Sequence, residues 1–165
     1  MTSEHLLHTI PPIYDRNSKI LILGSFPSVK SREVSFYYGH PQNRFWRVLA
    51  AVLGCAVPSS NEEKTALLQS HNIALWDVIK SCDIVGSSDS SIKNVVPNDI
   101  GVILSSCGIR QIYSNGKTSE KLFNKYIKDP VGRDTVALPS TSPANASYNL
   151  ERLTDSWSVI KNNIR

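Results

Sequence analysis

Polar side chains and small residues follow several short apolar runs of the sequence, where they could form a binding site. These segments are GSFPS from Gly24, Asp77, SNG from Ser114 and PSTSP from Pro139. A further stretch, YYGHPQNRFW, begins at Tyr37 and gathers aromatic rings, a histidine, an amide and an arginine around a Gly-His-Pro turn. The flat ring of Tyr38 and the short amide of Asn43 are suited to stacking on a nucleic acid base and holding a water molecule.

Ordinary structural roles compete with these functional ones. Phe45, Trp46 and Arg47 fall within a helical pattern, so we expect them to pack against the core rather than to act on a ligand. Asn43 is also suited to capping that helix. Asp77 is equally suited to a capping or surface position.

Several common functional motifs do not occur in the sequence. NGKTS at Asn115 lacks the upstream glycine of a phosphate-binding GxxxxGK[ST] loop, and no GxSxG nucleophile elbow is present. The three cysteines form no CxxC pair and the four histidines no HExxH set, so we predict neither a disulfide framework nor a metal site. The first residues, MTSEHLLHTIPP, do not resemble a signal peptide, and no apolar run approaches the length of a membrane span. We therefore expect a cytoplasmic protein.

Apolar runs and helical periodicity predict the elements that must hold these side chains. Nearly continuous apolar runs, typical of buried strands, occupy residues 19–23, 73–79, 109–113 and 135–138. Helical patterns occupy residues 43–53, 62–70, 98–106, 118–127 and 148–160. The run at 73–79 is interrupted by Asp77, and we expect the strand to end near that carboxylate. The serine-rich segment from Gly86 to Asn94 is expected to be an exposed connecting loop.

Strands that alternate with helices predict an α/β fold with a mostly parallel four-stranded sheet. Ligands of such folds bind beyond the carboxyl ends of the strands, so the polar segments should meet at one edge of the sheet. With 165 residues and 41% apolar composition, residues 1–165 are expected to form one domain. The net charge of +4, spread along the chain, only slightly favours an anionic partner such as nucleic acid.

Four strings resemble the uracil-DNA glycosylase superfamily: GSFPS, HPQNRFW, ALWDVI and LPSTSPANAS, in that order along nearly the whole chain. HPQNRFW and the LPS loop before the last helix are the specific matches. The resemblance implies a three-layer αβα fold and a monofunctional DNA glycosylase that acts as a monomer on double-stranded DNA, without a cofactor. Iron–sulfur members of the superfamily use four cysteines, and the three scattered cysteines here do not match that version.

The first of these loops departs from the family pattern. Most branches have Asp or Asn there to position the attacking water, whereas this chain has Phe26. The sequence is similar in this respect to the hypoxanthine-DNA glycosylase branch, in which an amide from the following stretch takes over. The resemblance therefore implies that Asn43 is the catalytic residue and holds the water through its carbonyl oxygen. Because an amide is a weak base, its contribution is positioning, and the developing sugar cation supplies the driving force.

Other family positions imply a set of base-binding residues. Tyr38, two residues before His40, stands where related enzymes have an aromatic that stacks on the flipped base. Asp77 replaces an Asn that reads the base edge in uracil-specific relatives, and its carboxylate suits a base with an N–H donor, such as N1 of hypoxanthine. Backbone N–H groups around Ser25 and Phe26 are expected to stabilise the departing base. His40 is expected only to shape the turn.

A second set of residues is expected to contact the DNA. The hydroxyl-rich loop from Ser140 to Ser147 is suited to gripping phosphates, and its tip to filling the minor-groove gap left by the flipped base. An ordinary helix-capping loop is the alternative. Lys117 suits a phosphate contact better than a Schiff-base role. The expected DNA-binding residues are Ser28, Lys117, Ser140, Thr141, Ser142, Pro143, Ala144 and Asn145.

The sequence thus predicts an enzyme of base excision repair that hydrolyses the N-glycosidic bond of deaminated bases, chiefly hypoxanthine. Two alternatives stay open. The site could prefer uracil, for instance in G·U mismatches, because a single contact can reverse base choice. The chain could instead be a non-catalytic reader of damaged bases, since Phe26 stands where the family has an acid or an amide.

Overall fold

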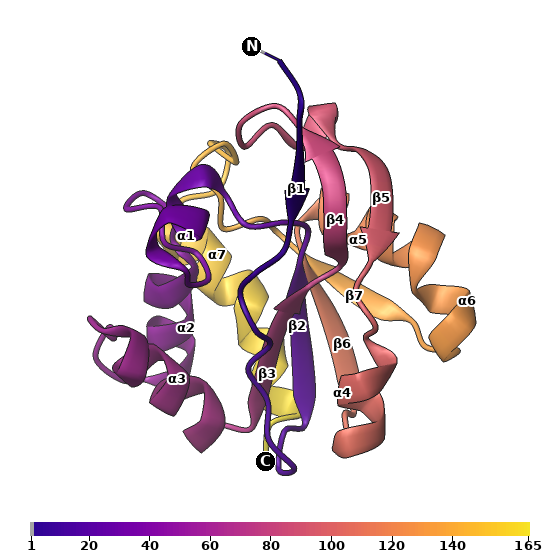
Figure 1. The fold of residues 1–165 in the computed structure, drawn as a ribbon. Coiled ribbons are helices and arrows are strands. Elements are labelled where there is room, and N and C mark those ends of the chain that lie inside the picture. Colours follow the sequence, from indigo (N-terminus) through magenta and orange to yellow (C-terminus); the bar gives the residue numbers. More distant parts are fainter. Residues whose placement is uncertain (1) are drawn as a thin grey trace.

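A sheet of four parallel strands forms the centre of the protein (Figure 1), in a computed structural model that describes residues 2–165. The strands are β2 (Ile20–Gly24), β3 (Ile73–Asp77), β6 (Gln111–Asn115) and β7 (Thr135–Leu138). Their order across the sheet is β3-β2-β6-β7, and each neighbouring pair is parallel. This confirms the predicted parallel four-stranded sheet.

Helices cover both faces of this sheet, which gives the predicted three-layer αβα arrangement (Figure 1). The helices are α1 (Val29–Val34), α2 (Phe45–Leu53), α3 (Asn61–Ser70), α4 (Gly101–Ser106), α5 (Lys117–Tyr126), α6 (Lys128–Val131) and α7 (Leu150–Trp157). The 3-10 helices η1 (Asp89–Ser91) and η2 (Ser158–Asn162) complete the helical elements. All five predicted helices begin one to three residues away from the expected position, and α1 lies in a segment expected to be a loop.

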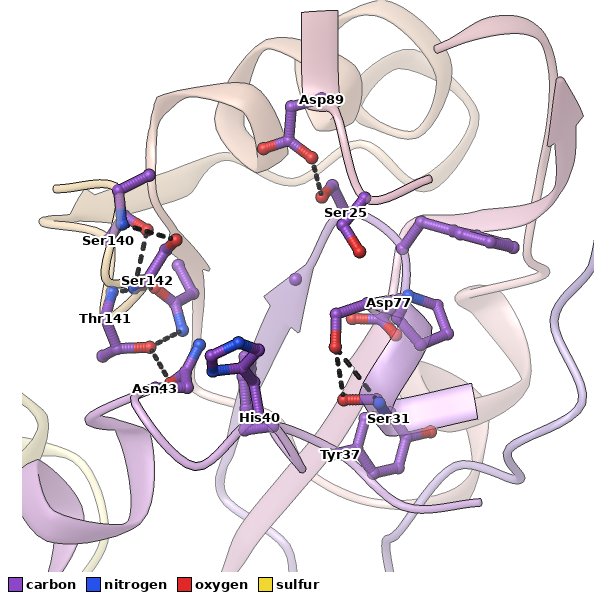
Figure 2. A pocket seen from close by; sticks show the side chains of 18 of the residues that line it. Ser25, Ser31, Tyr37, His40, Asn43, Asp77, Asp89, Ser140, Thr141 and Ser142 are labelled. Carbon is purple, nitrogen blue, oxygen red and sulfur yellow. Dashed lines mark hydrogen bonds between the residues drawn. The ribbon is translucent and has the colours of Figure 1, made fainter. Parts of the chain in front are cut away.

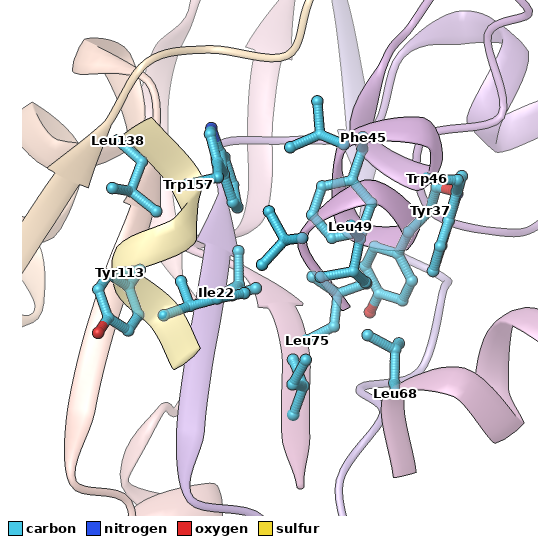
Figure 3. Close-up of a cluster of buried hydrophobic side chains, with 14 of the residues drawn as sticks. Ile22, Tyr37, Phe45, Trp46, Leu49, Leu68, Leu75, Tyr113, Leu138 and Trp157 are labelled. Carbon is cyan, nitrogen blue, oxygen red and sulfur yellow. The ribbon is translucent and has the colours of Figure 1, made fainter. Parts of the chain in front are cut away.

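Side chains of β2 alternate between two hydrophobic cores, which explains its uninterrupted apolar sequence. Ile20 and Ile22 contribute to the core under α2 and α7, while Leu21 and Leu23 contribute to the core under α4 and α5. Figure 3 shows the first core, in which the rings of Phe45 and Trp157 pack edge to face. A strand buried on both faces holds its carboxyl end rigidly, and the loop after it carries part of the site.

The start of α2 corrects one expectation. Phe45 and Trp46 are buried as predicted, but Arg47 is exposed and does not pack into the core. Its guanidinium lies 3.4 Å from the carbonyl oxygens of Gln42 and Asn43 on the protein surface. The reason is geometric, because Arg47 lies on the face of α2 opposite to the apolar stripe.

A second, antiparallel sheet was not expected from the sequence. It consists of β1 (Glu4–Leu7), β4 (Ile79–Ile84) and β5 (Lys93–Pro97), in the order β1-β4-β5. Residues 73–79 therefore belong to two sheets, since β3 ends at Asp77 as predicted and β4 begins two residues later. No side chain of β1 or β5 is fully buried, and these strands lack the apolar run that marks a buried strand.

Candidate active site

A cavity of about 340 Å³ lies beyond the carboxyl ends of the parallel strands (Figure 2). This volume is at the lower end of the range of roughly 300–1,000 Å³ that is usual for small-molecule sites. Its walls come from the segments after β2, β3, β6 and β7, together with the loop before α2. The expectation that the polar segments converge at one edge of the sheet is confirmed. The residues used below are Gly24, Ser25, Phe26, Tyr38, His40, Asn43, Asp77, Asp89, Asn115 and Thr141.

Asp77 ends β3 with its carboxylate almost entirely removed from solvent. Oδ2 lies 2.8 Å from Nε2 of His8, and the two side chains are 5% and 2% exposed. A buried carboxylate requires such a partner, because an unpaired charge is very costly inside a protein. The His8 backbone N–H donates to the carbonyl of Lys80, so β4 helps to hold the ring in place. Asp77 is therefore neither a surface residue nor a helix cap.

Gly24 permits the Asp77 carboxylate to approach the end of β2. A Cβ atom added at this position would lie 2.4 Å from Oδ1 of Asp77 and 3.0 Å from the hydroxyl oxygen of Tyr38. Both distances are at or below the closest approach of real side chains. The glycine of GSFPS thus makes room for two polar atoms at the base of the cavity.

Tyr38 lines the cavity, and one face of its ring is covered. The ring stacks on Phe45 with centroids 4.1 Å apart and an interplanar angle of 21°. Burial raises the pKa of the Tyr38 hydroxyl far above its usual range, the charge of Asp77 adds to this effect, and the nearby Asn115 side chain acts in the opposite direction; the net shift keeps the phenol protonated. Among residues 2–165, this buried hydroxyl has no hydrogen-bond partner. Only the other face of the ring is left for the expected stacking on a base.

The side-chain amide of Asn43 is fixed by two hydrogen bonds to its oxygen. Oδ1 accepts from the backbone N–H of Phe45 at 2.9 Å and from the hydroxyl of Thr141 at 2.9 Å. These two donors occupy both lone pairs, so the expected contact between Oδ1 and a water is not available in this arrangement. Nδ2 points away from Thr141 (Figure 2), and no hydrogen bond within residues 2–165 uses it. Asn43 consequently presents a donor to the cavity.

The loop after β7 reaches Asn43 through a chain of hydrogen bonds. Asn115, at the end of β6, donates from Nδ2 to the Thr141 hydroxyl and accepts from the Thr141 backbone N–H, both at 3.0 Å. Because Oγ1 of Thr141 accepts from Asn115, its own hydrogen points to Asn43. Thr141 is completely buried. Its hydroxyl already donates to Asn43 and accepts from Asn115, so Thr141 orients the amide in place of the phosphate contact expected from the sequence.

Arg44 clamps the rest of the same loop. Its guanidinium donates to the carbonyl oxygens of Ser142 at 2.9 Å, Asn145 at 3.1 Å and Tyr148. Its backbone N–H donates to the carbonyl of Thr141 at 3.0 Å. HPQNRFW and LPSTSPANAS, about 100 residues apart in sequence, thus form one unit.

The first loop contributes Ser25 and Phe26 to the cavity wall. Phe26 packs edge to face on the His8 ring, with centroids 6.0 Å apart, and so covers the pair formed by His8 and Asp77. The Ser25 hydroxyl lies 3.4 Å from Oδ1 of Asp89, a residue of the serine-rich segment. That segment is thus part of the cavity wall and not merely a connector.

Asp89 is a second carboxylate at the cavity. Although Asp89 as a whole residue is exposed, burial of its carboxyl group raises its pKa, and the negative charge of Asp77 raises it further, while hydrogen bonds from Ser25 and Thr118 act in the opposite direction. No ion pair includes Asp89 in the described part of the chain.

The family model of the uracil DNA glycosylase superfamily matches residues 11–162, a range that includes every residue of the cavity wall. The chain belongs to the uracil DNA glycosylase superfamily. Within the superfamily, two relatives are named hypoxanthine DNA glycosylase. The one from Methanosarcina barkeri is 36% identical over 137 residues, which is 82% of this chain and 85% of the relative. The one from Methanosarcina acetivorans is 34% identical over 152 residues, or 91% of this chain and 94% of the relative.

A solved structure agrees with this assignment. The solution NMR structure of a protein from Methanosarcina acetivorans, provisionally described as a uracil DNA glycosylase, superposes with a TM-score of 0.79 at 33% identity. The match covers 93% of this chain and 95% of that one. The relation therefore extends over nearly the whole fold.

Several functional positions of this superfamily member escaped sequence analysis. His8, which pairs with Asp77, and Asp89, which lines the cavity, come from separate elements and belong to no recognisable motif. Asn115 lies in the SNG segment expected at this edge, but its hydrogen bonds to Thr141 were not predicted. Arg44 lies within HPQNRFW, so the motif was a signal, but its loop contacts were not predictable. His40 lines the cavity as well as shaping the turn, and its Nδ1 accepts from the Gln42 backbone N–H at 3.1 Å.

The predicted DNA-binding residues are spread over the site. Ser28 caps α1, with its hydroxyl accepting from the Ser31 N–H, and Lys117 is exposed at the start of α5, outside the cavity wall. Pro143 and Ala144 form an exposed tip, whereas Asn145 turns back and donates to the Ser140 carbonyl.

Two kinds of feature are absent from residues 2–165. No group of three or more His, Cys, Asp and Glu side chains is arranged to hold a metal ion. No helix has both the length and the apolar composition needed to cross a bilayer.

Proposed function

We propose that this chain is a monofunctional DNA glycosylase that releases deaminated bases, chiefly hypoxanthine, from double-stranded DNA. The observation that carries the proposal is the buried Asp77 carboxylate in a cavity of about 340 Å³, which has room for a nucleobase. Hydrolysis at a sugar carbon requires the nucleotide to leave the stack, and the enclosed cavity provides a place for the flipped base. The relatives named hypoxanthine DNA glycosylase support the same choice of base.

The charge of Asp77 explains why a deaminated base is preferred to adenine. A carboxylate only accepts hydrogen bonds, and hypoxanthine presents N1–H where adenine presents a lone pair. Adenine in this cavity would leave the carboxylate facing an acceptor, which is unfavourable. Uracil offers an equivalent N–H at N3, so a preference for uracil is the alternative to be tested.

Asn43 acts in the proposal as a donor that positions water. An Nδ2–H bond to the water oxygen leaves one lone pair free to attack the sugar carbon. Phe45 and Thr141 fix the amide in this orientation, so little reorganisation is needed during the reaction. This assignment replaces the contact through Oδ1 that the sequence analysis predicted.

The loop clamped by Arg44 is the proposed DNA contact. Its exposed tip at Pro143 and Ala144 is suited to entering the gap left by the flipped base. Ser140 and Ser142, together with Lys117 on α5, are proposed to contact phosphates. Every residue given a role comes from one copy of the chain, so the proposal requires only a monomer.

Base release from single-lesion duplexes tests this function. Labelled duplexes with one deoxyinosine or one deoxyuridine are incubated with the protein, and abasic sites are then cleaved with alkali. We expect abasic product from the deoxyinosine duplex. No product from either duplex would leave only the non-catalytic reader, and release of uracil alone would establish the alternative base preference.

Asn43→Asp tests the donor role in the same assay. The variant keeps an oxygen for the Phe45 N–H and the Thr141 hydroxyl but loses the Nδ2 donor. Removing one such preorganised donor lowers rates by about 100- to 1,000-fold in other enzymes, and we expect a loss of that order. Gln42→Ala, at an exposed position of the same loop, is the control and should leave the rate unchanged. A fully active Asn43→Asp variant would reassign the role.

A further inference from the structure

The base of the cavity contains an unusual buried group, the unpartnered hydroxyl of Tyr38. A buried hydroxyl normally has a hydrogen-bond partner, and leaving one unpaired is unfavourable. The backbone at Tyr38 is also unusual, since its φ of 53° lies in the left-handed region that bulky residues rarely adopt. Two unfavourable features at one cavity residue indicate a functional constraint.

A hydrogen-bond acceptor, Oδ1 of Asp77, lies near the Tyr38 hydroxyl. A Cβ atom placed on Gly24 would lie 3.0 Å from Tyr38 Oη and 2.4 Å from Asp77 Oδ1. The two oxygens can therefore be no farther apart than about 5.4 Å, the sum of these distances. Tyr38 Oη makes no hydrogen bond to Asp77 within residues 2–165. A protonated phenol and a carboxylate at this spacing offer one donor and one acceptor to the same ligand edge.

We infer that Tyr38 and Asp77 together recognise an adjacent C=O and N–H of the flipped base, with His8 holding Asp77 in position. In hypoxanthine these groups are O6 and N1–H, which pair with the Tyr38 hydroxyl and with Asp77 Oδ1. The inference deepens the proposed function and rests on it for the flipped base as ligand. It changes Tyr38 from the predicted stacking platform to a hydrogen-bond donor.

His8 and Phe26 explain how the carboxylate of Asp77 is oriented. His8 binds Oδ2, so Oδ1 is the oxygen that is left for the base. Phe26 packs on the His8 ring, and Tyr37 lies on it from another side at 6.1 Å between centroids. The aromatic ring at position 26 thus shields the pair of His8 and Asp77 from water, which strengthens the hydrogen bond. His8 is a positioning residue in this arrangement.

The recognised edge determines which bases are excluded. Adenine and cytosine reverse the order of donor and acceptor, so both contacts are lost. Guanine has the same edge as hypoxanthine, but it is held in a stable pair with cytosine and is therefore harder to flip.

Binding to duplexes that resist cleavage tests the inference without relying on catalysis. The probes carry 2′-fluoro-2′-deoxyinosine or the matching 2′-fluoro purine nucleoside, whose base lacks O6 and N1–H. The wild type should bind the inosine duplex more tightly. Tyr38→Phe keeps the ring and its stacking on Phe45 but lacks the hydroxyl. It should weaken inosine binding by roughly 5- to 100-fold, leave purine binding unchanged and keep the melting temperature at least as high.

Tyr37→Phe is the matched control. The Tyr37 hydroxyl is paired, since it donates to the carbonyls of Pro11 at 2.8 Å and Ile10 at 3.3 Å. Its removal should lower the melting temperature without changing the preference for inosine over purine. The two neighbouring tyrosines should therefore behave in opposite ways.

His8 is tested by a conservative pair of variants. His8→Leu should abolish the preference for inosine, and His8→Gln, which keeps an N–H donor for Asp77, should restore part of it. Equal loss of binding to both probes in Tyr38→Phe, or an unchanged preference in Tyr38→Phe, would overturn the inference. A wild type that prefers the inosine probe but releases no base would refute the proposed function and leave the inference standing.

Discussion

Gly24→Ala should disturb the site through one methyl group, with little direct effect on the backbone. The φ of Gly24 is not in the left-handed region, so alanine is allowed there. The added Cβ would lie 2.4 Å from Asp77 Oδ1, and ordinary contacts begin at 3.4 Å, so the carboxylate must retreat by up to about 1 Å. A retreat of this size would stretch the 2.8 Å bond between His8 and Asp77 beyond hydrogen-bonding distance.

The expected magnitude follows from two opposing terms. Loss of a hydrogen bond to a charged group costs about 1.5–3 kcal/mol, and the reduced freedom of the unfolded chain returns about 0.4–1 kcal/mol when glycine becomes alanine. The free energy of unfolding should therefore fall by about 1–2 kcal/mol, measured by urea denaturation. Base release should fall by about 100-fold, because an error of about 1 Å at a reacting site has an effect of that order.

Two comparisons isolate the cause. Gly108→Ala, where an added Cβ meets no atom within 4 Å, should be as stable as the parent or slightly more stable. In an Asp77→Ala background only the 3.0 Å approach to the Tyr38 hydroxyl remains, so Gly24→Ala should cost much less there. The reasoning is refuted if Gly24→Ala keeps parental stability and activity, or if its cost is the same with and without Asp77.

Two further predictions concern the loop clamp and the second carboxylate. Arg44→Ala removes the hydrogen bonds to three loop carbonyls, so we expect a stability loss of about 2–3 kcal/mol, faster proteolysis of residues 140–148 and loss of base release. Parental protease resistance would contradict the clamp. Asp89→Asn should be at least as stable as the parent at pH 7, because the raised pKa of Asp89 means that its charged form is disfavoured in the folded protein. The difference in free energy of unfolding between Asp89→Asn and the parent, measured by urea denaturation, should shrink as the pH falls and Asp89 gains a proton. A difference that grows in acid would contradict a pKa raised by burial.

Local patterns were sufficient for the elements that bury the most apolar surface. The parallel strands were predictable because strands covered on both faces require nearly continuous apolar sequence, as in Ile20–Gly24. The motifs GSFPS, HPQNRFW and LPSTSPANAS identified the family and the edge of the sheet where the site lies. The antiparallel sheet was missed because its outer strands, β1 and β5, are short and carry mostly polar or half-exposed side chains.

Tertiary contacts decided the chemistry of the individual side chains. The sequence placed Asn43 and Asp77 in the site, but the role of an amide depends on which of its atoms is already bonded, and Thr141, 98 residues away, settles that for Asn43. In the same way His8, 69 residues from Asp77, determines which carboxylate oxygen is already bonded and which is free. Sequence thus determined which segments meet at the ends of the parallel strands, because apolar runs and motifs are local signals. Only the folded structure determined which atoms they present, because hydrogen bonds between distant segments have no periodicity to predict them.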